Sequence, residues 1–190
     1  MASSTISSAG GPVFFWREYD SPYGFLSQWY PSSFTPFTPS LTGTPPMTFV
    51  TTEQYMMYHK AIVFNDQEIA DKIALEPEAS KQKALGRKVK GFDNKIWNAK
   101  REKIVEDGNW WKFTQAKESD LRKMLLETGD RLLVEASPYD RIWGVGYGAA
   151  NAEANRNNWG ENLLGKALMR VRDRLHAEED KNTDEIGKKL

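Results

Sequence analysis

The fold is decided by the stretch TTEQYMMYHKA, residues 51–61, which has the pattern of a helix that begins at a polar cap. Thr51 and Gln54 have the spacing of a capping box, so the helix starts at the second threonine of the stretch. Glu53 lies in the first turn, and Lys60 follows seven residues later. Seven residues make about two turns, so both side chains are predicted to project from one face, about 10 Å apart along the axis.

The sequence on both sides of this helix predicts an α+β fold, a single mostly helical domain with a few short strands. Cap residues and apolar stripes at helical spacing predict six helices, and short runs of aromatic and β-branched residues predict strands. The predicted caps of the second, fourth and fifth helices are Asn65, Asp93 or Asn94, and Ser119. The predicted helices span about residues 52–64, 65–76, 78–85, 93–108, 119–129 and 161–178. The end of the fourth helix, at Gly108, is left open. The predicted strands span residues 13–16, 47–50 and 131–136.

The composition limits the classes of function. Lys and Arg number 26, as do Asp and Glu, so no global basic field argues for non-specific attachment to DNA or a membrane, and only a local patch stays open. The absence of cysteine excludes disulfides, thiolate metal sites and cysteine nucleophiles. His59 and His176 lie far apart in the sequence, so no metal centre is expected, and His59 is interpreted as structural or exposed. No apolar run approaches the ~20 residues of a membrane helix and no signal-peptide pattern is present, so we expect a cytoplasmic or nuclear protein.

Segments of biased composition flank and interrupt the domain. Residues 1–12 are small and polar and are predicted to be a disordered N-terminus. Residues 31–46 are dense in Ser, Thr and Pro and are predicted to form a long surface loop. Residues 178–190 form a charged segment that we expect to be a flexible tail. One domain is therefore predicted over residues 13–177.

Each candidate residue has a structural interpretation beside the functional one. A glutamate in a first turn suits the helix dipole, as Glu53 would. Lys60 could extend its amine to solvent, and Trp97 on the apolar stripe of the fourth helix is typical of a core residue. Asp140 follows a buried strand, where it either forms an Asx turn with the amides near Ile142 or carries a function. These alternatives stay open for each residue taken alone.

Taken in order, several blocks of the sequence resemble the NADAR superfamily. They cover roughly residues 13–175, and their order within one domain makes the signal specific. The blocks are FFW at 14–16, SPYGFLS at 21–27, TTEQYMMYHKA at 51–61, ALGR at 84–87, Trp97, LLETG at 125–129, LLVEAS at 132–137, DRIWG at 140–144 and WGENLLGKALM at 159–169.

The resemblance implies a catalytic domain over residues 13–177 that hydrolyses an N-glycosidic bond between a ribose C1 atom and nitrogen. We expect removal of ADP-ribose from ADP-ribosylated guanine in nucleic acid, and the expected partner is that nucleic acid or an ADP-ribose-like nucleotide. The alternatives are hydrolysis of phosphoribosylamino-pyrimidine intermediates of riboflavin synthesis, or a non-catalytic module that binds ADP-ribose or a nucleotide. No cofactor, metal or membrane is expected to take part.

The resemblance also assigns residues to roles. The catalytic residues are expected to be Glu53, Lys60 and Asp140. The residues expected to bind substrate are Trp97, Trp143, Gly144, Arg17, Tyr23, Gly24, Arg87 and Asn162. A carboxylate can stabilise the oxocarbenium character that develops at C1, while a neutral lysine could form a Schiff base with the sugar. The indole rings suit stacking on a base, and the two arginines suit phosphate contacts.

Overall fold

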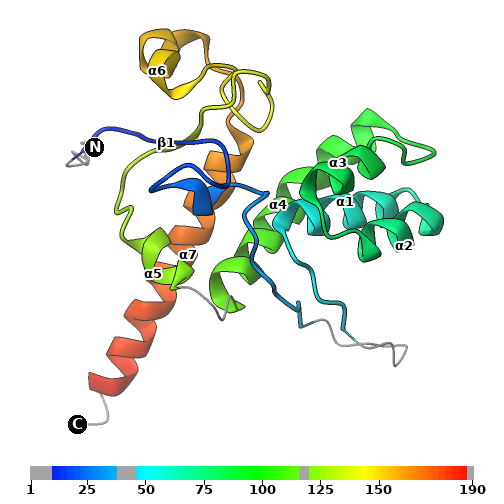
Figure 1. Ribbon diagram of the computed structural model, residues 1–190. Helices are drawn as coiled ribbons and strands as arrows, with labels where there is room; N and C mark the ends of the chain where they lie inside the picture. Colours follow the sequence, from blue (N-terminus) through cyan, green and yellow to red (C-terminus); the bar gives the residue numbers. More distant parts are fainter. Residues whose placement is uncertain (1–9, 38–45, 116–119, 188–190) are drawn as a thin grey trace. The chain divides into compact units, whose positions relative to one another are not determined.

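The structure is a computed structural model that describes residues 10–37, 46–115 and 120–187. The chain divides into two compact units (Figure 1). We call Arg17–Arg122 the helical unit, and Met1–Trp16 together with Lys123–Leu190 the strand unit. Most of the predicted disordered N-terminus, the middle of the predicted surface loop, the predicted cap Ser119 and the last three residues of the predicted tail lie outside the described residues.

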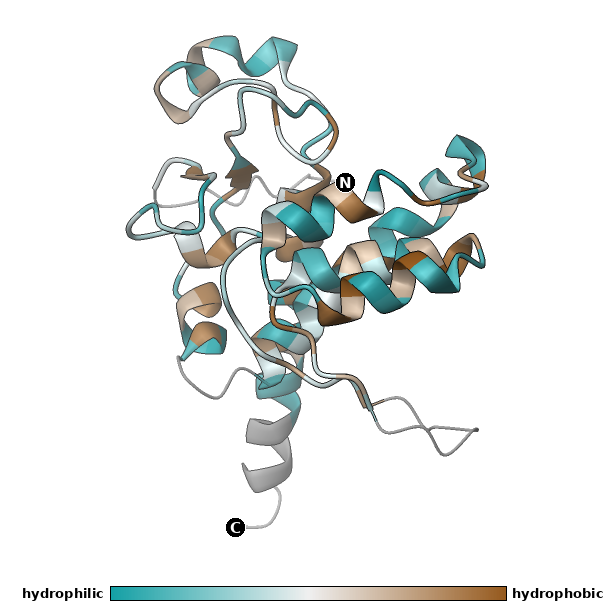
Figure 2. Ribbon diagram, turned by 45° about the vertical axis from the view of Figure 1, so that its right-hand side comes forward, coloured by the Kyte–Doolittle hydropathy of each residue, from teal (hydrophilic) through white to brown (hydrophobic). Residues whose placement is uncertain are grey.

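The helical unit is built around one central helix. Its elements are η1 (Gly24–Leu26), α1 (Thr52–Val63), α2 (Gln67–Leu75), α3 (Ala79–Gly86) and α4 (Asn94–Gln115). Helix α1 contacts α2, α3 and α4 (Figure 1). Hydrophilic and hydrophobic turns alternate along these helices (Figure 2), as expected when each buries one face against a neighbour. The first helix of the sequence prediction is therefore the centre of this unit.

Of the predicted helix caps that lie in the described residues, two are confirmed and one is shifted by a residue. Thr51 accepts a hydrogen bond from the Gln54 amide at 3.0 Å, which confirms the predicted start of α1. Asp93 accepts one from the Ile96 amide at 2.8 Å at the start of α4. The cap of α2 is Asp66 rather than Asn65, because it is the Asp66 side chain that accepts the Ile69 amide, at 3.3 Å.

Aromatic packing joins the loop before α1 to the helices. Phe34, Phe49 and Tyr55 form a buried cluster. Phe34 and Phe49 exchange both backbone hydrogen bonds, at 3.0 and 2.9 Å. This single antiparallel bridge stands where the sequence predicts a strand over residues 47–50, so that prediction is wrong in extent.

The strand unit holds a short parallel sheet. Strand β1 (Val13–Phe15) pairs with β2 (Leu133–Glu135), and both occupy predicted positions. The remaining elements are α6 (Ala149–Ala152), η2 (Glu153–Asn158) and α7 (Leu163–Gly187), while α5 (Leu121–Leu126) crosses the boundary between the units. Helix α7 continues past residue 178, where the sequence predicts a tail. Helices with a small sheet confirm the predicted α+β class.

Helix α7 is fixed to the segment between α5 and β2 by buried polar contacts. The Arg172 guanidinium donates to Thr128 Oγ1 at 2.8 Å and to the Arg131 carbonyl at 2.9 Å. Val134 of β2 forms a buried cluster with Val145 and Ala152, and Trp159 packs against this cluster. These contacts hold the loop that follows β2, which contains Asp140.

Candidate functional site

Glu53 is a buried carboxylate at the start of α1. Its side chain and backbone are only 3% exposed. Its amide donates to the Gln28 carbonyl at 3.0 Å, and the Thr52 hydroxyl donates to the same oxygen at 3.0 Å. The first turn of α1 is therefore anchored on the segment after η1, and this anchor fixes where the carboxylate lies.

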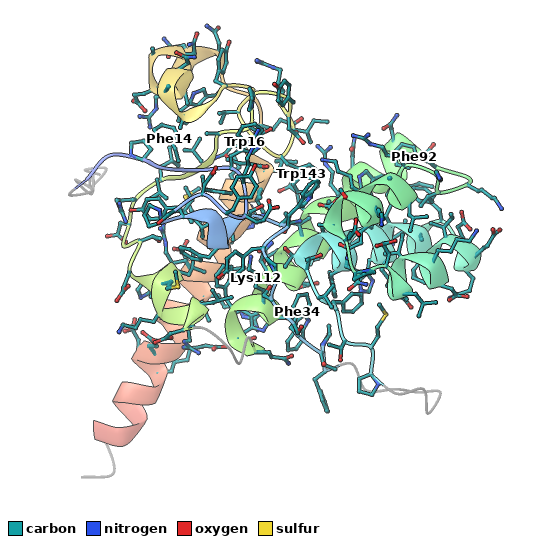
Figure 3. All side chains as sticks on the ribbon, viewed as in Figure 1. Phe14, Trp16, Phe34, Phe92, Lys112 and Trp143 are labelled. Atoms are coloured by element: carbon teal, nitrogen blue, oxygen red, sulfur yellow. The ribbon has the colours of Figure 1, made fainter. Side chains whose placement is uncertain are left out.

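Lys60 turns its amine toward protein groups rather than extending it to solvent. The Nζ atom donates to the Gly86 carbonyl at 2.9 Å. It lies 4.4 Å from the centroid of the Phe92 ring and 5.8 Å from that of Trp97. Phe92 is labelled in Figure 3, on the segment between α3 and α4. The lysine is thus held by one carbonyl and two aromatic rings.

The electrostatic surroundings of Lys60 favour its neutral form. Burial is the main cause that lowers the pKa of this amine from its ordinary value. The negative charge of Glu53 opposes the shift, while the positive charge of Arg87 adds to it. A lysine whose pKa is lowered carries more neutral amine near neutral pH, which is the form that acts as a nucleophile.

Trp97 and Arg87 join this group from α4 and from the end of α3. Trp97 is 8% exposed, so its ring packs in the interior as the structural interpretation predicts, and it also meets the Lys60 amine. Arg87 is the exposed C-cap residue directly after α3, and its charge acts on the amine. The structure therefore brings Glu53, Lys60, Arg87 and Trp97 together, and we call them, with Phe92, the lysine cluster.

Three other predicted residues of the helical unit lie around η1. Arg17 is exposed, and its guanidinium lies over the Tyr19 ring at 5.7 Å. Tyr23 is half-buried and directly precedes η1, whose first residue is the buried Gly24. The Gly24 carbonyl accepts the Ser27 amide at 2.9 Å. These residues shape the segment that continues to Gln28, on which α1 is anchored.

The predicted residues of the strand unit form a second group, in the loop after β2. Asp140 Oδ1 accepts hydrogen bonds from the amides of Ile142 and Trp143, both at 2.8 Å, so the carboxylate makes the Asx turn that one interpretation predicts. Trp143 is half-buried and is labelled in Figure 3. Gly144 is buried where a Cβ atom would lie 2.7 Å from the Glu135 carbonyl, so the turn approaches β2 too closely for a side chain.

Asn162 is the predicted binding residue whose side chain the fold itself uses. Its Nδ2 donates to the Leu133 carbonyl at 2.9 Å, and its Oδ1 accepts the Glu135 amide at 3.0 Å. Its φ of 50° lies in the left-handed region that asparagine tolerates. We therefore assign Asn162 to positioning: it ties the start of α7 to β2 and holds the turn with Gly144.

Two residues that contact the Lys60 amine were missed from the sequence. Gly86 was quoted only as part of the ALGR block, yet its carbonyl holds the lysine amine. Phe92 follows a glycine just before the Asp93 cap of α4, and its side chain is 42% exposed. An aromatic residue before a helix cap was the available signal, although nothing in the sequence spacing connects it with Lys60.

In residues 10–37, 46–115 and 120–187, no group of three or more His, Asp or Glu side chains could hold a metal ion. Within the same residues, no helix combines the length and the apolar character that crossing a membrane requires.

Several known proteins are similar to this chain in sequence or in fold. The model of the NADAR domain matches residues 14–176. An N-glycosidase of Acanthamoeba polyphaga mimivirus is 45% identical over 150 residues, which are 78% of this chain and 85% of that protein. A riboflavin biosynthesis protein of Vibrio vulnificus is 30% identical over 164 residues, which are 86% of this chain and 38% of that longer protein. The NMR structure of the E. coli protein YbiA matches with a TM-score of 0.68 at 25% identity, over 89% of this chain and 87% of that one.

These comparisons confirm the resemblance inferred from the ordered sequence blocks. The domain model spans most of the sequence, and it includes both the lysine cluster and the Asp140 loop. Since a relative at 45% identity also covers more than two thirds of the sequence, the chain belongs to the NADAR family.

Proposed function

We propose that this chain is a hydrolase of N-glycosyl bonds, an N-glycosidase that cleaves the bond between a ribose C1 atom and a base nitrogen. The observation that carries the proposal is the Lys60 amine, held 2.9 Å from the Gly86 carbonyl with a lowered pKa near a buried glutamate. The mimivirus relative that is named an N-glycosidase supports the same reaction class. The proposed substrate is ADP-ribosylated guanine, and the reaction would reverse ADP-ribosylation.

The chemical character of the lysine cluster suits a nucleotide of this kind. Phe92 and Trp97 offer aromatic faces beside the amine, on which a base or a sugar face can stack. Arg87 is exposed and can reach a phosphate of the diphosphate group, as can Arg17. The buried Glu53 can stabilise positive charge at C1, because a carboxylate out of water acts strongly on nearby charge.

The reaction can proceed through a covalent intermediate. The neutral Lys60 amine attacks C1, a new C–N bond forms, and the bond from C1 to the base nitrogen breaks. The proton lost by the amine passes through Glu53 to the departing base. Opening of the ribose ring gives a Schiff base between C1 and the lysine. Water then adds to C1, the C–N bond to the lysine breaks, and free sugar and amine are restored.

The Asp140 loop is proposed to take part in substrate binding. One oxygen of Asp140 accepts two backbone amides, which leaves its second oxygen available for a ribose hydroxyl or a proton. Trp143 is proposed to stack on the base. Asp140→Asn keeps an acceptor for the Asx turn and removes the charge, so it tests the charge apart from the fold of the loop.

The experiment that tests the proposal uses an oligonucleotide with ADP-ribosylated guanine. Release of free ADP-ribose is followed by chromatography for the wild type, Lys60→Ala and Lys60→Arg. We expect release by the wild type, at least a 100-fold lower rate in both variants, and a borohydride-trapped adduct that mass spectrometry places on Lys60. Absence of release by folded wild type overturns the proposed substrate, and unchanged release in Lys60→Ala overturns the Schiff-base route alone.

A second candidate substrate is a phosphoribosylamino-pyrimidine, as in riboflavin synthesis. It is supported by the relative named a riboflavin biosynthesis protein, of which this chain matches 38%. The same bond type would be cleaved by the same lysine cluster. Parallel assays with both substrates decide between them by kcat/KM, and tight binding of ADP-ribose without turnover of either would favour the non-catalytic module.

A further inference from the structure

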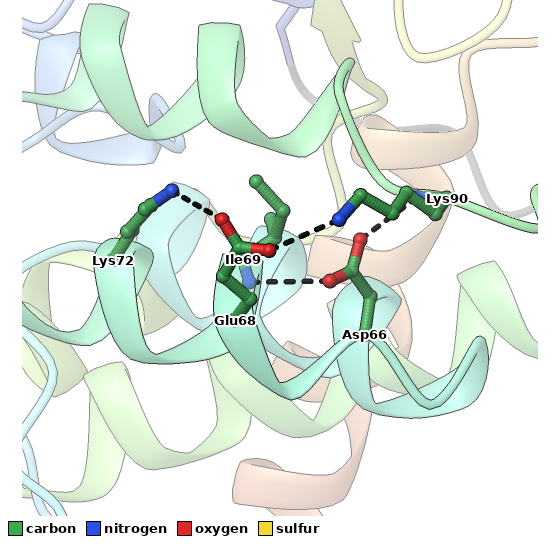
Figure 4. Close-up of polar contacts among 5 residues, drawn as sticks. All are labelled: Asp66, Glu68, Ile69, Lys72 and Lys90. Atoms are coloured by element: carbon green, nitrogen blue, oxygen red, sulfur yellow. Dashed lines mark hydrogen bonds and ion pairs between the residues drawn. The ribbon is translucent and has the colours of Figure 1, made fainter.

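Asp66 is a buried residue whose hydrogen bonds reach several elements of the helical unit. Its amide donates to the Ala61 carbonyl at 3.0 Å, in the last turn of α1. One carboxylate oxygen accepts the Ile69 amide at 3.3 Å, and the other accepts the Lys90 amide at 2.8 Å (Figure 4). We call residues 87–93 the α3–α4 connection. Asp66 therefore ties α1 and the start of α2 to this connection.

The α3–α4 connection covers the Lys60 amine with an aromatic ring. Phe92 follows Lys90 by two residues, and the centroid of its ring lies 4.4 Å from Lys60 Nζ. The same ring lies 5.3 Å from that of Phe64, the C-cap residue of α1. Gly91, between Lys90 and Phe92, has a φ of 67°, in the left-handed region that glycine adopts readily. The position of the ring over the amine thus depends on where Lys90 is held.

The side chain of Lys90 makes the weaker of its two contacts. Its amine pairs with Glu68 at 3.0 Å, and Glu68 also pairs with Lys72 (Figure 4). The Lys90 and Glu68 side chains are 72% and 59% exposed, and ion pairs this open to water contribute little. The bond from the Lys90 amide to Asp66 joins a backbone donor to a buried carboxylate, which makes it the stronger contact.

We propose that Asp66 is a positioning residue of the reaction, which holds the α3–α4 connection so that Phe92 covers the Lys60 amine. This inference rests on the proposed function, in which that amine is the nucleophile. Asp66 acts through Lys90 and Phe92 rather than on the substrate itself. The contacts form a closed path, because the Asp66 amide is bound to Ala61, the residue after Lys60, and the Phe92 ring returns to the Lys60 amine.

Release of the connection is expected to raise the pKa of Lys60. Burial is the main cause that lowers this pKa, the charge of Arg87 adds to the lowering, and Glu53 opposes it. A displaced Phe92 ring exposes the amine to water and so removes part of the main cause. Attraction of the ammonium form to the ring acts in the opposite sense, but it is weak at a partly exposed site. Less neutral amine then remains near neutral pH.

Two variants break the bond between Asp66 and Lys90 from opposite ends. Asp66→Ser keeps an oxygen that caps α2, but the shorter side chain does not reach both amides. Lys90→Pro removes the amide hydrogen and leaves the Asp66 cap intact. Lys90→Gln is the matched control, because it removes the same charge and keeps the amide. By charge alone, loss of a carboxylate and loss of a cation shift the pKa of Lys60 in opposite directions, whereas loss of the bond shifts it upward in both variants.

Trace acetylation with acetic anhydride measures the amine without any substrate. Acetylation of Lys60 is followed against pH by mass spectrometry of its peptide, with the exposed Lys95 as internal reference. Asp66→Ser and Lys90→Pro are both expected to move the midpoint for Lys60 to higher pH, and Lys90→Gln to keep that of the wild type. With active enzyme, kcat at pH 7 is expected to fall by about 10-fold or more in the first two variants.

The outcomes separate this inference from the proposed function. An unmoved midpoint in either folded variant, shifts of opposite sign, or an equal shift in Lys90→Gln overturns the role of Asp66. Urea unfolding shows whether each variant is folded, and Lys90→Pro decides alone if Asp66→Ser is not. Acetylation needs no turnover, so a wild type without N-glycosidase activity overturns the proposed function and leaves this measurement of the amine valid.

Discussion

The Lys60 Nζ atom lies 2.9 Å from the Gly86 carbonyl oxygen, and this contact joins the last turn of α1 to the last residue of α3. The close approach of the two helices depends on the missing side chain. A Cβ atom on Gly86 would lie 2.0 Å from the sulfur of Met57, a distance at which one of the groups must move. The position of the lysine amine therefore depends on how tightly α3 packs on α1.

Gly86→Ala is expected to destabilise the protein by about 1–3 kcal/mol, because it overpacks this contact. Met57→Ala in the same chain makes room, so the double variant is expected to be more stable than the sum of the two single changes predicts. Urea unfolding of the four proteins measures the coupling. Gly148→Ala is the control, because a Cβ atom there meets nothing within 4 Å. Strict additivity of Gly86→Ala and Met57→Ala would contradict the predicted contact.

Arg87→Gln is expected to move the rising limb of the pH–rate profile to higher pH. The neutral amine of Lys60 is the reactive form, and the Arg87 charge helps to lower the pKa of that amine. Without the charge the pKa rises, so a higher pH is needed for the same neutral fraction. Measurement of kcat/KM against pH checks this, with Lys81→Gln as a matched loss of charge elsewhere on α3. A limb that moves equally in both variants would show that Arg87 has no specific effect.

His59→Phe is expected to reduce the acid sensitivity of folding. Burial lowers the pKa of His59 to about 4, and its ring lies 4.2 Å from that of Tyr55. Between pH 6.5 and 4 the unfolded chain binds the proton that the folded chain excludes. The free energy of unfolding therefore falls by about 3 kcal/mol as the pH is lowered through this window. Urea unfolding at pH 7, 5.5 and 4.5 is expected to show a smaller loss in the variant. His176→Gln, an exposed position, is expected to behave as wild type.

Lys112→Met is expected to change the alkaline side of the stability profile. Lys112 is 0% exposed, donates to the Ser27 carbonyl at 2.9 Å, and has a pKa lowered by burial to about 7. Above pH 7 the folded chain holds a neutral amine while the unfolded chain stays protonated to about pH 10.4, so stability rises with pH through this window.

The wild type is therefore expected to gain stability relative to Lys112→Met between pH 7 and 10, by an amount of the order of 4 kcal/mol. Unfolding free energies of both proteins at pH 7, 8.5 and 10 give the difference. Lys166→Met, at an exposed position of α7, serves as the reference for the loss of a lysine. A difference between wild type and Lys112→Met that stays constant with pH would mean that the buried amine keeps its proton.

The local sequence was enough to predict most of the secondary structure. Helix α1 starts where the Thr51 hydroxyl accepts the Gln54 amide, and strand β1 occupies the aromatic run near the beginning of the chain. Such features depend on contacts within a few residues, so they can be inferred from spacing. The extent of α7 was underestimated because a charged helix end has the same composition as a disordered tail.

The sequence by itself determined the family and the α+β class, because residue order and helical spacing carry that information, and it predicted the candidate site residues. Only the tertiary structure decided that β1 and β2 pair in parallel and that Lys60 donates to Gly86 beside Phe92. These contacts join residues whose separation in sequence has no periodic signature. They form because burial of apolar surface brings α3 and α4 against α1, and the lysine amine must then find a polar partner away from water.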